Sequence, residues 1–450
     1  MRVLLPALLA LCGALRGNEL LLPGDPFGEL TRLRLARAGE DALRATAPDA
    51  ERELELRAGL GKGGPWLEGG AAARLAPHLR ARLWLAGTGE EGGEALLGTH
   101  TTRGGWTGRI LRSTLTWESP HVLLEWGRRS LCAGEDRISE LAWSRQVPPV
   151  DMARGMLRTR DGRLSLELAC ARLSSQQDAE LNRWYARHRV VWLPGGGRDL
   201  RLACGDQVLY TGASRGPEWS LLNPFIPFFL ENFEGYSEAA HGQSVDGDNS
   251  SLFFTLDAGR PLSPRLRAGC YLDLLVDEFQ LDAADRRKLD DALGVTAGLE
   301  LQRQLAAGRA LRLRWEGSAL SHWVYIHRGR ETSFLEQGHV IGNEEGGDLV
   351  EQHIQVQLYR LEGRLELLSL TAGRIWKGGV APGAAWEAEA TKDAPWPLPP
   401  VRRSWRFAVV ACVQPSPRVA LGAEAERRTA GEGWTLRCRV ALRLAAGESR

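Results

Sequence analysis

The stretch 434–444, WTLRCRVALRL, alternates apolar and polar residues over its whole length. Trp434 and Leu436 fall on one face of an extended chain, and Arg437 and Arg439 fall on the other, because strand side chains point alternately to opposite faces. The stretch therefore predicts a β-strand with one apolar face and one strongly charged face.

Runs of the same kind recur from about residue 77 onward, separated by Gly, Pro, Asp and Asn. In one of them Leu311 and Leu313 oppose Arg312 and Arg314. Alternation alone also fits a soluble sandwich, which buries its apolar face. Roughly fifteen to twenty charged runs instead favour a barrel whose polar face lines a lumen and whose apolar face meets lipid. The sequence predicts an all-β fold, a large antiparallel transmembrane β-barrel of about 16–18 strands in the outer membrane.

The N-terminal region has a different residue pattern. Arg2, an apolar run over 3–15 and Arg16 predict a secretory signal peptide over residues 1–17, and the run is too short to cross a bilayer as a helix. Cys12 leaves a lipoprotein signal as an alternative. Leucines spaced among Ala and Glu predict short helices, so we expect a small helical periplasmic segment over 18–75 and the barrel over 76–450.

Charge is balanced, with 57 basic and 56 acidic residues, which argues against a nucleic-acid partner. All the basic residues are arginine except Lys62, Lys288, Lys377 and Lys392. Planar guanidinium forks suit carboxylate or phosphate ligands, although a GC-rich genome is an alternative cause of this bias.

Four cysteines fall in step with leucines, as Cys204 does after Leu200 and Leu202. Cys170, Cys270 and Cys438 follow the same phase, and all four are predicted to be small apolar residues on the outward face, with disulfides between neighbouring strands left open. No Cys or His spacing indicates a metal site, and we expect no cofactor.

Two blocks of the chain resemble the Wzi capsule assembly family. The first reads WSLLNPFIPFFLENFEG, DGDNSSLFFTLD and YLDLLVDEFQLD between residues 219 and 282, with Asn223-Pro224, Asp248-Asn249 and Tyr271 through Phe279 at the matching places. The second block, over 311–350, carries these matching residues: Glu316, Trp323, Val324, Tyr325, His327, Gly338, Gly342 and Asp348.

The resemblance implies an eighteen-strand type of barrel with a periplasmic helical piece, whose outer loops bind capsular polysaccharide or exopolysaccharide at the cell surface. It implies a lectin without catalytic residues. The partners that it implies are an acidic polysaccharide, outer-membrane lipid and the capsule export machinery. A general porin, favoured by the charged lumen alone, is the main alternative function.

Candidate ligand-binding residues come from the same blocks. Tyr271, Asp273 and Asp277 share one face of a predicted strand and should point into the lumen, either as ligand contacts or as partners of arginines. The two carboxylates are about 13 Å apart, which is too far for the paired carboxylates of a glycosidase. Arg314 and Glu316 are further candidates from the polar face of 311–316.

Trp323, Tyr325 and His327 are expected on one face of a strand, as a platform for a sugar ring or as part of an interfacial aromatic girdle. Asp248 and Asn249, which open a predicted strand in the first block, complete the candidate ligand-binding residues.

Asp246 and Asp248 could come within about 7 Å of each other, inside the range of an inverting glycosidase pair. The sequence VDGDN is also a turn signal. A glycan hydrolase built into the barrel is therefore a third, weaker hypothesis.

Overall fold

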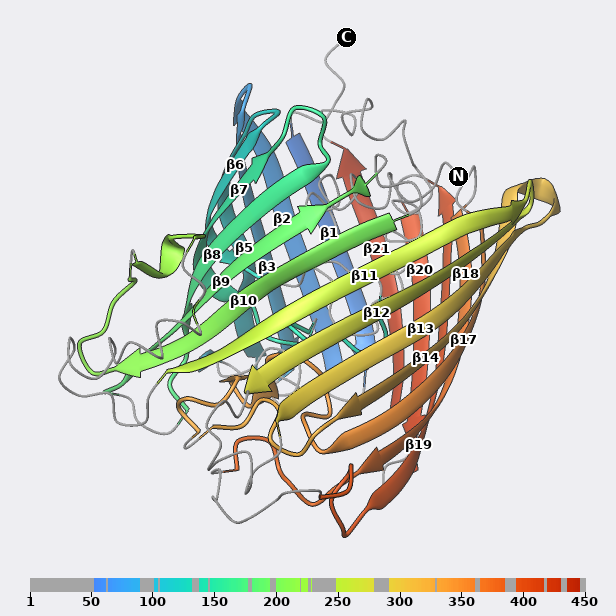
Figure 1. The fold of residues 1–450 in the computed structure, drawn as a ribbon. Helices are drawn as coiled ribbons and strands as arrows, with labels where there is room; N and C mark the ends of the chain where they lie inside the picture. Colours follow the sequence, from blue (N-terminus) through green and yellow to red (C-terminus); the bar gives the residue numbers. More distant parts are fainter. Residues whose placement is uncertain are drawn as a thin grey trace.

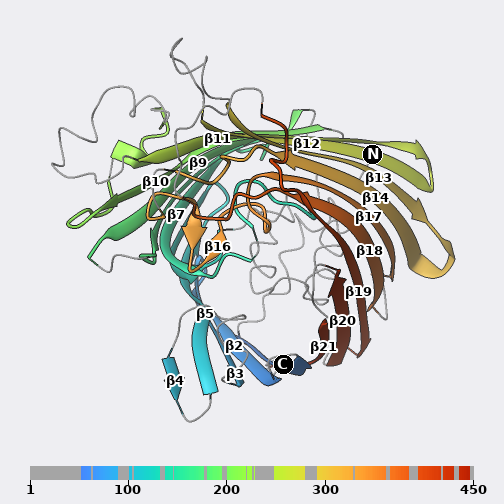
Figure 2. The same ribbon diagram turned by 90° about the horizontal axis from the view of Figure 1, so that it is seen from below.

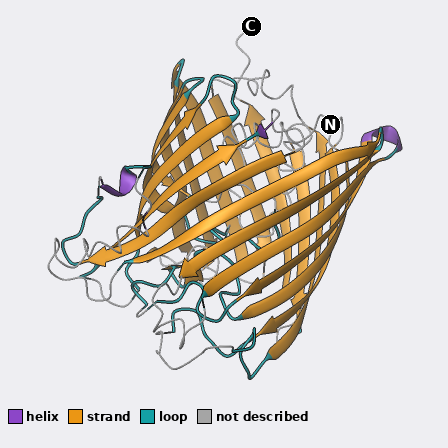
Figure 3. Ribbon diagram, in the orientation of Figure 1, coloured by secondary structure: helices purple, strands orange, loops and turns teal. Residues whose placement is uncertain are grey.

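The computed structural model of the chain describes residues 52–61, 64–89, 101–103, 106–131, 137–144, 146–176, 180–194, 200–218, 220–225, 228, 248–278, 291–327, 330–360, 365–384, 394–416, 419–429 and 435–445. Strands form almost all of the regular structure in these residues (Figure 3). In chain order they are β1 (Arg52–Gly61), β2 (Gly64–Ala76), β3 (Leu79–Gly89), β4 (Thr101–Arg103), β5 (Trp106–Glu118), β6 (Val122–Arg129), β7 (Val150–Arg158), β8 (Leu164–Leu173), β9 (Asn182–Trp192), β10 (Leu200–Gly212), β11 (Asn249–Ser263), β12 (Leu266–Glu278), β13 (Ala292–Gln304), β14 (Arg309–Leu320), β15 (Leu335–Glu336), β16 (His339–Val340), β17 (Leu349–Arg360), β18 (Leu365–Lys377), β19 (Arg402–Ser416), β20 (Val419–Arg428) and β21 (Thr435–Ala445).

The strands close into a barrel. Nineteen of those described form one antiparallel sheet, in which successive strands pair as hairpin neighbours and β1 pairs with β21, so that Glu53 stands opposite Ala445 (Figure 1). The short strand β4 pairs only with β5 and lies outside the ring, so eighteen strands complete it. The predicted antiparallel barrel of about 16–18 strands is confirmed.

The barrel wall is apolar on its outer face and charged on its inner face, which is the reverse of a soluble protein. On β14 the outward Leu313 and Trp315 are 44% and 39% exposed, whereas the inward Arg314 and Glu316 are 2% and 0% exposed. The same inversion recurs around the ring, where the exposed apolar residues include Leu83, Leu85, Leu115, Leu124, Leu157, Phe254, Leu272, Leu299, Ile354, Leu368, Leu370 and Phe407. A soluble protein would bury such side chains, so this belt is the surface that meets lipid.

The two ends of the barrel differ in their connections. Short turns at 77–78, 119–121, 159–163, 264–265 and 305–308 lie at the end where β1 begins and β21 ends, which we call the terminus end. Longer connections, such as 213–248 and 321–348, lie at the opposite loop end. In outer-membrane barrels the short turns face the periplasm, which places the loop end outside the cell.

Parts of two long connections fold into the lumen. The 137–144 segment between β6 and β7 and the β15–β16 hairpin between β14 and β17 lie inside the ring (Figure 2). They bury an apolar cluster with inward residues of the wall, including Leu141, Phe334 and Ile341 from the segments and Tyr185 and Leu275 from the strands. The described part of the loop end is therefore packed with side chains.

The predicted helical segment over 18–75 is wrong in its second half, because Arg52–Gly61 and Gly64–Ala76 are β1 and β2 of the barrel. Leu54 and Leu56 alternate with Glu53 and Glu55, a period of two that belongs to a strand. Residues 18–51 and the predicted signal over 1–17, with Cys12, lie outside the described residues. Within those that are described, every helix is too short or too polar to cross a membrane.

Candidate functional site in the barrel lumen

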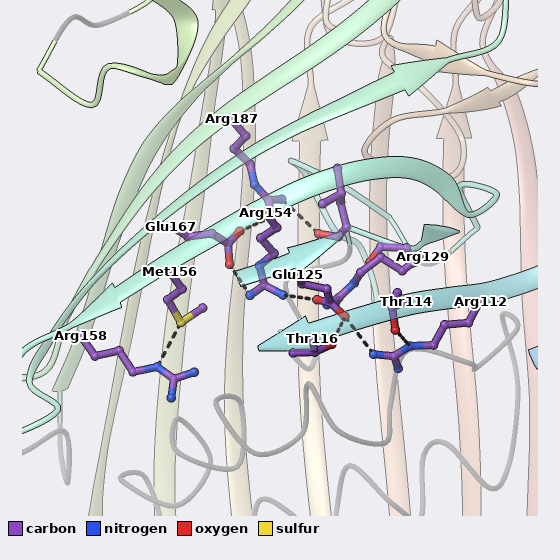
Figure 4. Close-up of polar contacts among 12 residues, drawn as sticks. Arg112, Thr114, Thr116, Glu125, Arg129, Arg154, Met156, Arg158, Glu167 and Arg187 are labelled. Carbon is purple, nitrogen blue, oxygen red and sulfur yellow. Dashed lines mark hydrogen bonds and ion pairs between the residues drawn. The ribbon is translucent and has the colours of Figure 1, made fainter. Parts of the chain in front are cut away.

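A ladder of arginines and glutamates lines the inner wall from β5 to β9 (Figure 4). Its first rung is Glu125 on β6, which is 4% exposed. Arg112 on β5 donates to Glu125 at 3.2 Å, Arg129 donates to its second oxygen, and Arg154 on β7 lies 3.7 Å away. One carboxylate is therefore shared among three guanidinium groups.

The second rung is Glu167 on β8. Arg154 and Arg187 each donate to one of its oxygens at 2.5 Å (Figure 4). Arg154 thus joins the two rungs, and Arg187 also donates to the carbonyl oxygen of Leu131 at 3.1 Å. The Nε atom of Arg154 has no hydrogen-bond partner within the described part of the chain, so donors exceed acceptors at this point.

Charge is distributed unevenly around the lumen. Among its described side chains, the wall formed by β2 to β10 carries inward carboxylates at Glu68, Glu118, Glu125 and Glu167. Its inward arginines are Arg74, Arg80, Arg82, Arg109, Arg112, Arg129, Arg154, Arg158, Arg183, Arg187, Arg189 and Arg201. The wall from β11 to β17 instead carries Asp257, Asp273, Asp277, Glu300, Glu316 and Glu351 beside Arg267, Arg312 and Arg314. The first wall is therefore strongly cationic, and an anionic chain in the lumen would be drawn to it.

Several candidate ligand residues on the acidic wall hold the 137–144 segment. Arg137 donates to Asp273 and to Asp257, both at 2.6 Å, and its guanidinium carbon lies 3.8 Å from the ring centre of Tyr271. These contacts tie a loop residue to β11 and β12. The prediction that Asp273 points into the lumen is confirmed, and its partner there is an arginine.

Glu316 fixes the same segment through the backbone. Its two oxygens accept hydrogen bonds from the backbone N–H groups of Ile138 at 2.9 Å and Ser139 at 2.6 Å, and the Tyr271 hydroxyl donates to it as well. Tyr271 lies against the backbone of Gly298, where an added Cβ would come within 2.0 Å of its ring. Only glycine at position 298 leaves room for this arrangement.

Tyr325 connects both inward segments. Its backbone N–H donates to Asp277 at 2.6 Å, its hydroxyl donates to the carbonyl oxygen of Leu141 at 2.8 Å, and the N–H of Asn343 donates to that hydroxyl at 3.1 Å. Tyr325 has a left-handed backbone with φ of 69°, a strained conformation that its bonds stabilise. Burial raises the pKa of the Tyr325 hydroxyl, so it stays protonated and can keep donating.

The hairpin segment is held from the cationic wall. Arg183 on β9, which is 0% exposed, donates to the carbonyl oxygens of Glu331 at 2.6 Å, Ser333 at 3.1 Å and Leu335 at 2.9 Å. The N–H of Ser174 donates to Glu336 at 2.8 Å, and burial raises the pKa of the Glu336 carboxyl. Buried polar residues of both walls therefore position the inward segments.

The expected strand carrying Trp323, Tyr325 and His327 is wrong. β14 ends at Leu320, and the residues that follow turn into the lumen because Asp277 binds the backbone of Tyr325. Tyr325 is 2% exposed and is neither a sugar platform nor part of a girdle, whereas Trp323 and His327 are half-buried. The indole of Trp323 lies against the ring of His322, with centroids 4.9 Å apart.

The remaining candidates also have protein partners. Both oxygens of Asp248 accept bonds from Arg215, at 2.5 Å and 2.8 Å, and Asn249 donates to the carbonyl oxygen of Thr332 at 3.0 Å. Arg314 lies 3.4 Å from Glu300. Asp246, the other half of the supposed hydrolase pair, lies outside the described residues.

Another part of the 213–248 connection covers the outer face of the wall. His188 and Asp206 point outward from β9 and β10 and lie 3.0 Å apart. The N–H of Phe228 donates to Asp206 at 2.8 Å, and His188 contacts the carbonyl oxygen of Leu221 at 3.0 Å. This segment shields a polar pair from lipid.

The cysteines on the outer face have the predicted phase. Cys204 and Cys270 are exposed there, whereas Cys170 is 7% exposed and lies 3.8 Å from the Tyr210 hydroxyl. None of these three forms a disulfide in the described chain.

No family model matches the sequence, and no curated protein sequence matches it. Among solved structures the fold is similar to that of Wzi of Escherichia coli, an outer-membrane protein involved in group 1 capsule assembly and a carbohydrate-binding β-barrel. The TM-score is 0.61 with 12% identity, over 93% of this chain and 88% of that one. The chain is a large outer-membrane β-barrel.

Two structures from Pseudomonas aeruginosa have lower scores. OpdK has a TM-score of 0.49 with 13% identity, over 87% of this chain and 98% of that one. OccD3 has a TM-score of 0.48 with 10% identity, over 88% of this chain and 91% of that one.

Sequence reasoning missed the residues that organise the lumen. Arg137, Arg183 and Glu351 were not singled out, although Glu351 accepts bonds from Ser139 and from Asn343, the latter at 2.8 Å. The sequence does contain a signal for Arg183, because this residue occupies an inward position in the alternating run of β9. The described residues contain no cluster of His, Cys, Asp or Glu suited to a metal ion.

Proposed function

We propose that this protein binds an acidic polysaccharide and holds it at the cell surface, as a capsule or exopolysaccharide attachment protein related to Wzi. The observation that carries the proposal is the excess of inward arginines on the wall from β2 to β10. Guanidinium groups bind carboxylates through two parallel charge-assisted hydrogen bonds, so repeated arginines suit a polymer with repeated carboxylates.

The packing of the loop end also supports binding over free passage. The inward segments are fixed by buried hydrogen bonds that they donate to Glu316 and Asp277 and accept from Arg183. A fixed surface loses less conformational entropy when a ligand binds. Trp323 and His327 remain half-buried on these segments and are the ring-bearing candidates for sugar contacts. Tyr271, Asp273 and Tyr325 would act by positioning the segments.

A passive anion channel is the second candidate, and the same cationic wall favours it. The two functions differ in what the lumen must pass. A channel conducts ions steadily when it is reconstituted in a planar bilayer, whereas a binding barrel with packed inward segments conducts little. We therefore expect low conductance of the reconstituted barrel. The proposed function also implies that outer-membrane lipid surrounds the apolar belt and that capsule export machinery passes the polymer to this protein. It involves no enzymatic step.

The variant Arg154→Gln/Arg187→Gln tests the proposal. It removes guanidinium groups from both sides of Glu167, and we expect affinity for an acidic polysaccharide to fall at least about tenfold, because each charge-assisted hydrogen bond is worth about 1.5–3 kcal/mol. Binding is measured as retention of the detergent-solubilised protein on immobilised polymer.

Arg128→Gln is the matched control, since Arg128 points outward from β6 and pairs with Asp151 at 2.6 Å. It should be retained like the wild type. Equal retention of the double variant and the wild type would remove the cationic wall from the binding site.

A further inference from the structure

The outer face of β18 carries a positive charge close to its loop end. Arg374 and Trp376 continue the outward series of the exposed Leu368 and Leu370, whereas Ile375 between them is 3% exposed and faces the lumen. An arginine therefore stands on the face of the wall that is otherwise apolar and meets lipid.

The strand register places a second arginine beside the first. On the neighbouring strand β19, Trp405 stands directly opposite Arg374, and Arg403 stands directly opposite Trp376. Arg403 and Trp405 are both exposed on the outer face. Residues at diagonal positions on one face of a strand pair are about 7–8 Å apart, which long side chains can span. The guanidinium groups of Arg374 and Arg403 can therefore meet at one small group between them.

Aromatic rings hold Arg374 on this face. Its guanidinium carbon lies 4.7 Å from the ring centre of Trp376 and 5.3 Å from that of Trp405, and both distances fit cation–π contacts. Trp405 also stacks on Phe407, with ring centres 6.1 Å apart and planes 11° apart. Amphipathic aromatic rings gather where the membrane meets water, at the level of the lipid headgroups. The rings therefore indicate that Arg374 lies at headgroup level.

Neither arginine is neutralised by the described part of the chain. Arg374 forms no ion pair or hydrogen bond there, and its Nε atom is buried without a partner. Arg403 forms no ion pair with these residues either. The described outward side chains in the loop-end halves of β18 and β19 include no carboxylate: they are Ala372, Arg374, Trp376, Arg403, Trp405 and Phe407.

Arg128 shows the contrasting case. It also faces outward near the loop end of its strand, β6, but it donates to both oxygens of Asp151, at 2.8 Å and 2.6 Å. A positive charge on a lipid-facing surface is costly unless it is paired or reaches the headgroups. The protein supplies the anion for Arg128, so we expect the membrane to supply it for Arg374 and Arg403.

We propose that Arg374 and Arg403 bind the phosphate group of a lipid headgroup in the outer leaflet. The loop end faces the outside of the cell, which brings both side chains to the headgroups of that leaflet. Guanidinium groups on two adjacent strands suit the oxygens of one phosphate, and the exposed rings of Trp405 and Phe407 offer apolar contact to the rest of the lipid. The site is separate from the lumen and goes beyond the proposed function.

The test measures lipid binding to the full chain in micelles of the uncharged detergent dodecyl maltoside. The probes are diphosphorylated lipid A, the same lipid after removal of its phosphates, and inorganic phosphate. Native mass spectrometry counts the lipids bound to each protein molecule during the titration. We expect the phosphorylated lipid to bind at least about tenfold more tightly than its dephosphorylated form, because hydrogen bonds to charged groups are strong. Inorganic phosphate, which lacks the apolar contact, should bind far more weakly than the phosphorylated lipid.

Three variants assign the effect to the two arginines. Arg374→Gln/Arg403→Gln should lose the preference for the phosphorylated lipid, and Arg374→Lys/Arg403→Lys, which keeps the charge without the forks, should retain an intermediate preference. Arg128→Gln should keep the wild-type preference, because Asp151 already neutralises that guanidinium. All three should bind the dephosphorylated lipid as the wild type does, which reports that the outer face is intact.

Several results would overturn this site. One is equal binding of the two lipids by the wild type, and another is an unchanged preference in Arg374→Gln/Arg403→Gln. Inorganic phosphate that binds as tightly as the phosphorylated lipid would assign the arginines to a free anion instead. Retention on immobilised acidic polysaccharide should be the same for Arg374→Gln/Arg403→Gln and the wild type, and its loss would assign the arginines to the polymer.

Discussion

Glu316→Ala is expected to detach the 137–144 segment from the acidic wall and to raise the ion conductance of the reconstituted barrel several-fold. Glu316 accepts from two backbone N–H groups and the Tyr271 hydroxyl while being 0% exposed. Its loss leaves buried donors without an acceptor, and we expect a cost of about 3–5 kcal/mol. Conductance in planar bilayers and proteolysis of the segment measure the two effects.

Glu300→Ala is the matched control. Glu300 lies on the neighbouring strand β13 and binds Arg312 and Arg314 of the wall. Its variant should keep the low conductance of the wild type. Conductance and protease resistance of Glu316→Ala that match the wild type would show that Glu316 does not hold the segment.

Leu313→Arg is expected to destabilise the barrel in lipid by about 2–4 kcal/mol, because it places a charge on the lipid-facing surface. Leu313 is 44% exposed at the middle of β14. The free energy of unfolding from lipid vesicles measures the effect.

Leu305→Arg makes the same change in the short turn between β13 and β14, where Leu305 is 39% exposed. Its cost should be at most about 1 kcal/mol, as expected for a position near the membrane interface. Equal costs at the two positions would contradict the assignment of the outer face to lipid.

The alternation of apolar and polar residues predicts the strands and which of their faces is apolar, because this pattern lies within the residues of each strand. Leu311, Leu313 and Trp315 on the outer face and Arg312 and Arg314 in the lumen follow from a period of two. The leucines over 52–61 also favour a helix in sequence, because Leu, Ala and Glu have high helix propensity, whereas the structure has strand β1 there. Sheet closure, which pairs Glu53 with Ala445, decides between the two.

The candidate site depended on contacts that no local pattern contains. Glu316 binds backbone groups 177 and 178 residues earlier in the chain, and Arg183 binds carbonyl groups 148 to 152 residues later. Tyr325 continues an apparently regular run, yet Asp277 on a different strand turns its backbone into the lumen. Residues chosen as ligand contacts therefore include several that position inward segments.

The most direct test of acidic polysaccharide binding compares one polymer in two charge states. The equilibrium affinity of the wild-type protein is measured for a uronate-containing polysaccharide and for the same polymer after its carboxyl groups have been reduced to alcohols. Binding through the cationic wall predicts that reduction weakens the affinity at least about a hundredfold, and that the difference shrinks as salt rises. Equal affinity for the two forms, or no affinity for either, would contradict it.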